Sequence, residues 1–175
     1  MAKKLTKPFF ILITCHLFFL SNIKTVFSQT PSNYPKVIGF VGLLHPIITL
    51  SSSGSNTNFH NNYVVGFPIG INIWKTENVG FSIEIVPFIK AENGLSKMNN
   101  LLFHPGILLK MSKSLTFAGR VAFETNGRYG FTPVINKVVM RSKYCKYFVA
   151  LPFPVRFGNN HPSSAGVGFQ FGIAF

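Results

Sequence analysis

The sequence contains no aspartate, and its four acidic residues are all glutamates, against 17 lysines and arginines. Without aspartate, an Asp-assisted catalytic triad is excluded. The positive charges fall one or two at a time between apolar runs and form no basic stripe or helix, so nucleic-acid binding is not predicted. Four of the lysines lie in the first 28 residues, and their removal would lower the formal net charge from +13 to +9.

Cysteine is nearly absent, with only Cys15 and Cys145. Cys15 lies in an N-terminal apolar stretch, where Thr14 before it and apolar residues after it fit a lipoprotein signal poorly. If that stretch is removed, the single Cys145 excludes an intramolecular disulfide and a cysteine-based metal site. The five histidines lack the spacing of metal ligands. We therefore expect no metal, no cofactor and no catalytic residues, and interpret the repeated pairs His45-Pro46 and His104-Pro105 as polar residues near bulges or strand ends.

The apolar stretch at the N-terminus is too short for a transmembrane helix. It spans Phe9 to Leu20, whereas a helix needs about 20 apolar residues to cross a bilayer. Lysines precede it, and Val26-Phe27-Ser28 follows as a small-residue cleavage site. This order is typical of a secretory signal peptide. We expect residues 1–28 to be removed between Ser28 and Gln29, leaving 29–175 as one barrel domain.

Aromatic residues are abundant, with 20 phenylalanines, and charged residues make up only 12 % of the chain. From Lys36 onward apolar residues recur at every second position, which places them on one face of a β-strand. With turn residues as boundaries, the pattern predicts eight antiparallel strands near 36–50, 61–75, 78–90, 99–111, 114–125, 129–140, 145–157 and 164–175. Most are long enough to cross a bilayer at a tilt, which takes about 9–11 residues.

Two features of the connections and strands test this interpretation. Longer connections, such as Ser51–His60 and Ala91–Met98, tend to alternate with tight ones, as in outer-membrane barrels. Seven prolines fall inside predicted strands, where they cannot donate ladder hydrogen bonds. They are Pro46, Pro68, Pro87, Pro105, Pro133, Pro152 and Pro154. In a closed barrel they must lie at bulges or near strand ends.

The two faces of the strands differ in a way that favours a membrane barrel. One face is nearly unbroken Phe, Ile, Leu and Val, and the other carries glycine, alanine and the charged residues Glu84, Lys110, Arg120, Glu124 and Arg156. Eight strands leave only a narrow interior, so the bulky face is expected outside against lipid. We expect the five charged residues to form a lumen network that plugs the barrel, with Glu84 paired to Arg120 and Glu124 to Arg156.

The end of the chain resembles that of the small eight-stranded outer-membrane β-barrel proteins of diderm bacteria. The resemblance rests on KYFVALPFPVRFGNN, the final strand GVGFQFGIAF and the terminal Phe175, together with the N-terminal signal. In that family the barrel-assembly machinery recognises a last strand that ends in an aromatic residue. The resemblance implies this assembly role for Phe175, with Phe169, Phe171 and Ile173 on the same face, and a location in the bacterial outer membrane.

The sequence thus predicts a non-enzymatic integral outer-membrane barrel in contact with membrane lipid. It would serve as a structural or interaction protein or as a narrow pore, and the polar loop 51–60 is the expected surface for an extracellular partner. Two alternatives remain: a soluble secreted or periplasmic ligand-binding β-barrel, and a small outer-membrane enzyme that modifies lipid. The enzyme would need a nucleophile or histidine near Glu84 or Glu124.

Overall fold

The computed structural model describes residues 33–59, 62–158 and 160–175. The expected signal peptide, 1–28, and its cleavage site at Ser28 and Gln29 lie outside these residues. No helix in the described part of the chain has the length and apolarity to cross a membrane. The strands are β1 (Lys36–Ser51), β2 (Gly54–Thr57), β3 (Tyr63–Gly66), β4 (Ile69–Trp74), β5 (Val79–Glu92), β6 (Leu95–Phe103), β7 (Gly106–Lys110), β8 (Leu115–Glu124), β9 (Tyr129–Arg141), β10 (Lys146–Pro152), β11 (Val155–Phe157) and β12 (Ser164–Ala174).

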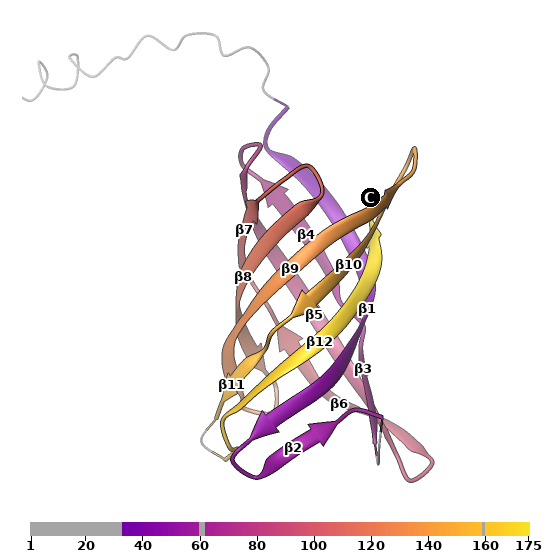
Figure 1. Cartoon of the computed structure of the whole chain (residues 1–175), viewed down its shortest axis with the longest axis vertical. Helices are drawn as coiled ribbons and strands as arrows, with labels where there is room; N and C mark the ends of the chain where they lie inside the picture. Colours follow the sequence, from indigo (N-terminus) through magenta and orange to yellow (C-terminus); the bar gives the residue numbers. More distant parts are fainter. Residues whose placement is uncertain (1–32, 60–61, 159) are drawn as a thin grey trace, which may run out of the picture. The chain divides into compact units, whose positions relative to one another are not determined.

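All of these strands join one antiparallel sheet that closes on itself, because β12 pairs with β1 along nearly its whole length. Figure 1 shows the resulting ring. Three pairs of short strands, β3 with β4, β6 with β7 and β10 with β11, are halves of single spans, and β2 pairs only with β1. The ring therefore has eight strands, and the expected all-β, antiparallel up-and-down barrel is confirmed. The eight predicted ranges match the eight spans to within a few residues.

Proline explains why three of the spans are interrupted. Pro68, Pro105 and the pair Pro152 and Pro154 lie at the breaks between half-strands, and Pro46 precedes a register shift in β1. The proline carbonyls still accept ladder hydrogen bonds of 2.9–3.0 Å, from Gly42 to Pro68, Phe67 to Pro87, Val121 to Pro105, Phe153 to Pro133 and Gly166 to Pro154. Each proline thus costs the sheet a donor but keeps an acceptor, and the ring closes without an edge.

One connection differs from the expectation. The segment 91–98 was expected to be a longer loop, but β5 continues to Glu92 and β6 begins at Leu95. Asn93 and Gly94 make the turn, both with positive φ, of 51° and 76°. Two consecutive residues of positive φ are typical of a type I′ hairpin, whose twist matches that of the flanking strands. The Asn-Gly dipeptide was the sequence signal for this tight turn.

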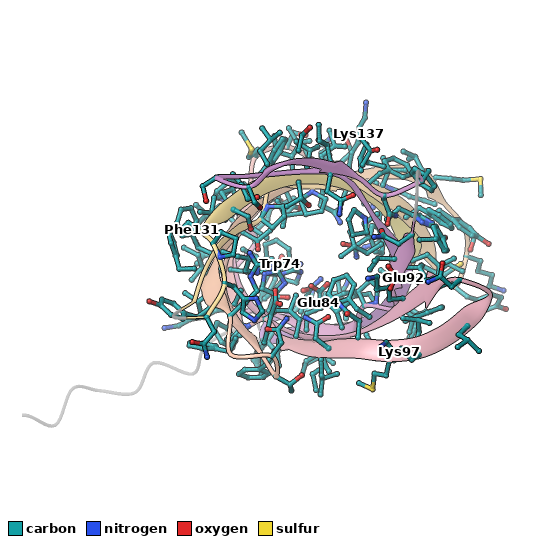
Figure 2. All side chains as sticks on the ribbon, turned by 90° about the horizontal axis from the view of Figure 1, so that it is seen from below. Trp74, Glu84, Glu92, Lys97, Phe131 and Lys137 are labelled. Carbon is teal, nitrogen blue, oxygen red and sulfur yellow. The ribbon has the colours of Figure 1, made fainter. Side chains whose placement is uncertain are left out.

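The two faces of the ring carry opposite kinds of side chain. Figure 2 shows Trp74 and Glu84 inside the ring and Phe131 and Lys137 outside it. Among the described residues, thirty large apolar side chains are exposed, whereas only nine hydrophobic residues are buried. The buried ones form two clusters in the lumen, Phe40, Leu108, Ala118, Val134, Phe148 and Ala150 in one and Val86, Leu102 and Ala122 in the other. The barrel is therefore apolar outside and mixed inside.

Candidate functional site

The centre of the lumen holds a buried ion pair between Glu84 of β5 and Arg120 of β8. Arg120 Nη1 donates to Glu84 Oε1 over 3.0 Å, and its Nη2 donates to Ser82 Oγ over 3.2 Å. His104, at the break between β6 and β7, places Nδ1 2.9 Å from the same carboxylate oxygen. The backbone aligns them, since His104 N donates to Glu84 O and Gly106 pairs with Arg120. All four side chains are nearly fully buried, so this is the expected first pair, with two additional partners.

A second ion pair lies farther along the lumen, between Glu124 at the end of β8 and Arg156 of β11. Arg156 Nε donates to Glu124 Oε1 over 2.7 Å, and Asn100 donates to the other carboxylate oxygen over 2.7 Å. Arg156 also donates to Thr132 Oγ1 over 3.0 Å. Both expected pairings are thus present. Charges held in a narrow interior need such partners, because an unpaired buried charge is strongly unfavourable.

Lys110 does not join this network, although the sequence placed it there. It ends β7 at one mouth of the barrel, where Nζ donates to Glu77 Oε1 over 2.9 Å. Glu77 lies in the turn between β4 and β5 and is exposed. The hydrogen bond and the positive charge of Lys110 lower the pKa of Glu77 from its usual 4.5. Lys110 is too far along its strand from the central carboxylates, so the register of β7 explains the correction.

Four residues of the network were missed in the sequence: Ser82, Asn100, His104 and Thr132. A signal was available for Ser82 and Asn100, since Ser82 shares its parity with Glu84 on β5 and Asn100 shares its parity with Lys110 on the β6–β7 span. His104 has the same even parity as Leu102 and Leu108, which are buried. The adjacent Pro105 obscured this, because a strand break leaves the direction of the preceding side chain open.

The network divides the lumen into cavities. The terminal vestibule, at the mouth where β1 begins and β12 ends, has a volume of about 210 Å³ and is lined by Phe40, Trp74, Lys110 and Phe148 among others. The loop vestibule, about 480 Å³, lies at the opposite mouth and includes Lys90, Arg128 and Arg156. Between them a cavity of about 60 Å³ is lined by Glu84, His104 and Arg120. The interior is therefore two vestibules separated by a polar plug.

Three buried polar atoms of the plug have no hydrogen-bond partner among the described residues. They are Glu84 Oε2, His104 Nε2 and Arg120 Nε. Their side chains line the central cavity of about 60 Å³. A water molecule needs about 10–15 Å³ by this measure, so the cavity has room for water to satisfy them. Glu84, His104 and Arg120 thus border a cavity that is large enough for water.

The C-terminal residues Phe169, Phe171, Ile173 and Phe175 all face outward and are exposed. Their strand is β12, which closes the ring against β1. Phe175 continues this ladder beyond the last assigned strand residue, exchanging backbone hydrogen bonds of 2.9 and 3.0 Å with Gly39. A Cβ on Gly39 would lie 2.7 Å from the Phe175 ring. The Phe175 ring therefore packs over Gly39, where β12 and β1 close the barrel.

The loop that follows β1 is pinned to the wall of the barrel by Asn58. Its side chain exchanges hydrogen bonds of 2.7 and 2.8 Å with the backbone of Val64, while β1 and β3 share only one paired position. Outside this seam His45 lies 3.0 Å from the Tyr63 hydroxyl and stacks on Phe171 at a centroid distance of 6.1 Å. As expected, His45 lies beside a bulge. The loop tip, residues 52–57, is polar and exposed.

Neither a metal centre nor a cysteine site emerges from the part of the chain that the structure describes. No three His, Cys or Glu side chains there gather closely enough to hold a metal ion. Cys145 is partly buried, with its Sγ 3.2 Å from Ser142 Oγ in the turn between β9 and β10.

The chain was compared with known families, curated proteins and solved structures. No family model matches it, and no curated protein matches it. A solved structure described as "De novo design of transmembrane beta-barrels" is similar over 84 % of this chain and 97 % of that chain, with 11 % sequence identity and a TM-score of 0.45.

Proposed function

We propose that this protein is an integral β-barrel of the bacterial outer membrane, with a closed lumen and a structural or interaction role rather than a catalytic one. The observation that carries the proposal is the exterior: thirty exposed large apolar side chains against nine buried hydrophobic residues among those described. A soluble barrel needs the opposite arrangement, because exposed apolar area of this extent is unfavourable in water. Lipid removes that cost.

The length of the strands supports the same conclusion. β5, β8, β9 and β12 have 14, 10, 13 and 11 residues, and about 9–11 residues cross a bilayer at a tilt. The closed ring leaves no unpaired sheet edge, which the hydrocarbon region requires. The soluble ligand-binding barrel and the narrow pore are the weaker alternatives, since the first conflicts with the apolar exterior and the second with the plug.

The plug also argues against a lipid-modifying enzyme. Glu84 and Glu124, the lumen carboxylates, are each engaged by an arginine. His104 is the only histidine bonded to one of them in the described residues, and it is buried in the centre of the barrel. A lipid on the outer surface has no route to that position. The geometry therefore favours a structural use of these charges.

Membrane insertion is tested by flotation and by gel mobility. Purified protein refolded with phosphatidylcholine vesicles should float with them and resist extraction by high salt or alkaline carbonate. On a gel it should migrate differently before and after boiling, because a closed barrel stays compact in cold dodecyl sulfate. Recovery of folded protein in aqueous buffer without detergent would contradict the proposal.

We further propose that the C-terminal strand is the segment that the outer-membrane assembly machinery recognises. The support is the exposed apolar row of Phe169, Phe171, Ile173 and Phe175 on the strand that closes the ring. Phe175→Ser should lower the amount of heat-modifiable protein in the outer membrane of cells, while spontaneous refolding into vesicles stays close to that of the unaltered chain. Ile107→Ser, an exposed residue of β7, is the matched control. Equal loss for both variants would show a general effect of surface polarity.

The exposed loop tip, residues 52–57, is the surface that we propose for an extracellular partner. It belongs to the 51–60 loop, at the mouth opposite the chain ends, and Asn58 holds its base. In barrels of this kind the chain ends and short turns face the periplasm. A protease cleavage site or a biotinylation tag inserted after Ser53 should therefore be accessible on intact cells. The same insertion in the turn at Glu77 should not be accessible.

A further inference from the structure

The terminal vestibule combines two features that a plug alone does not need. Its inner wall is apolar and aromatic, made by Phe40, Trp74 and Phe148, with the Phe40 and Phe148 rings edge to face at a centroid distance of 6.2 Å. Its rim is basic. We propose that this vestibule binds a small organic carboxylate with an apolar body, the carboxylate at the rim and the body against the aromatic wall.

The charge at the rim is strongly one-sided. Five cationic residues line it, namely Lys36, Lys110, Lys113, Arg141 and Lys146, and Glu77 is the only carboxylate among the lining residues. Glu77 is bound to Lys110, and within the described part of the chain no carboxylate forms an ion pair with any of the other four. A mouth lined by charge of one sign and backed by low-dielectric walls concentrates ions of the opposite sign. This rim therefore attracts anions.

The apolar wall narrows the chemistry of the anion. The volume of about 210 Å³ exceeds many times the 10–15 Å³ that one water molecule requires, so a molecule of several carbon atoms fits. Small-molecule sites typically pair an apolar lining with a few placed polar groups. A compact inorganic anion would leave the aromatic wall uncovered, and a neutral apolar molecule would leave the lysines unused.

The loop vestibule lacks this combination, although it too is basic. Its lining includes several asparagines and serines along with Lys90, Arg128 and Arg156, and among the described residues Phe88 is its one aromatic member. It is also larger, at about 480 Å³. The two mouths of the barrel thus differ in character, and only the terminal one offers an aromatic wall below a ring of cations.

Trp74 supplies a direct readout, because it is the only tryptophan of the chain and lines the vestibule. The full chain, refolded in an uncharged maltoside detergent, is titrated with benzoate, octanoate, benzyl alcohol and inorganic phosphate while Trp74 fluorescence is recorded. We expect a saturable change with benzoate or octanoate that weakens at high sodium chloride. The stronger of the two shows whether the body of the ligand is aromatic or alkyl.

Variants locate the site. Lys36→Gln/Lys146→Gln should weaken carboxylate binding at least about tenfold, and the single change Lys146→Gln should give part of that loss. Lys90→Gln, which removes a cation from the opposite vestibule, should bind within about twofold of the unaltered chain. The heat-dependent gel shift confirms that each variant is folded.

Four results would overturn the proposal: no saturable response of Trp74, equal affinity in the folded double variant, benzyl alcohol as tight as benzoate, or inorganic phosphate competing as well as benzoate. None of them bears on membrane insertion, which flotation and heat-dependent mobility test separately.

Discussion

At the scale of single residues, a small number of hydrogen-bond partners decides whether a charge buried in the lumen is tolerated. Glu84 is 2 % exposed and Arg120 8 %, and each would be costly alone. Their hydrogen bonds to one another, to Ser82 and to His104 offset most of the loss of hydration. A buried ion pair of this kind adds little stability over an apolar pair of similar volume, but removal of one partner is severe.

This asymmetry gives the first prediction. Glu84→Leu should lower the free energy of unfolding by about 3–5 kcal/mol, because the Arg120 guanidinium stays buried without a carboxylate. Glu84→Leu/Arg120→Met should recover most of that loss. Urea unfolding in lipid vesicles at neutral pH measures both.

Glu92→Leu is the matched control for this prediction, since its partner is the more exposed Lys90. It should leave the free energy of unfolding close to that of the unaltered chain, because ion pairs at an exposed position contribute little. If Glu84→Leu/Arg120→Met were as unstable as Glu84→Leu alone, the ion pair would stabilise the barrel by more than the two charges' compensation of each other's burial.

The sequence predicted these pairs because alternation fixes which side chains share the lumen and the strand order then fixes which charges are near one another. It placed Lys110 wrongly, because parity gives the face of a residue but not its height along the barrel. It overlooked His104 for a different reason: Pro105 breaks the strand, and the direction of a side chain at a break depends on the ring as a whole.

At the scale of the element, β9 shows the pattern of a lipid-facing strand that ends in an interface. Phe131 and Ile135 face outward in its middle, and Lys137 faces outward nearer the chain-end mouth. A lysine near the interface can extend its charged end toward the headgroups, whereas one at the centre of the bilayer cannot. Position along the strand therefore sets the cost of a charge.

The second prediction follows from this gradient. Ile135→Lys should destabilise the barrel in vesicles by about 2–4 kcal/mol, because it places a cation in the hydrocarbon region. Lys137→Leu should change stability by at most about 1 kcal/mol. Unfolding in urea with the barrel in vesicles measures both. A soluble barrel would show the reverse order, since Ile135 is already 42 % exposed and a lysine there would be harmless in water.

The turn between β4 and β5 gives a pH-dependent prediction. Lys110 lowers the pKa of Glu77 below 4.5 by a hydrogen bond and by its charge. Because the folded-state pKa is lowered, the contact stabilises the folded turn above about pH 4.5, and this contribution is lost as the pH falls through the folded-state pKa. Carbon-13 NMR titration of the carboxyl group should show a midpoint below 4.5 for Glu77, and Lys110→Gln should raise it toward that value.

Glu92 serves as an internal control in the same titration. Its pKa is lowered by Lys90, at the other mouth, so Lys110→Gln should leave its midpoint unchanged. If Glu77 kept its low midpoint in Lys110→Gln, a different group would have to be responsible.

The strands themselves were the most predictable elements. Period-two alternation located all eight spans because each has one apolar, outward-facing side, and a shift of one residue would invert every side chain. The breaks at Pro68 and Pro105 agree with the expectation that prolines inside the predicted strands lie at bulges or near strand ends. The hairpin at Asn93 and Gly94 was missed because Glu92 before the turn and Ser96 and Lys97 after it resemble a loop in composition, although they pair as strands.

At the scale of the whole molecule, the lumen consists of two vestibules of different character, separated by two buried ion pairs. The apolar exterior is what supports the proposed place in a membrane, and the plug is what supports a closed interior. Cations outnumber carboxylates in the lining of both vestibules. A pore opened through this lumen would therefore prefer anions.

The last prediction tests the plug as the barrier. The unaltered barrel in a planar bilayer should show no steady conductance. Glu84→Ala/Arg120→Ala/Glu124→Ala/Arg156→Ala removes both pairs, so no buried charge is left alone, and it should join the three cavities into an anion-preferring pore. Glu77→Ala/Lys110→Ala, which removes an ion pair at the mouth, should stay closed. If the quadruple variant floats with vesicles and keeps its heat-dependent mobility yet does not conduct, the apolar clusters around Leu102 and Leu108, rather than the charges, close the lumen.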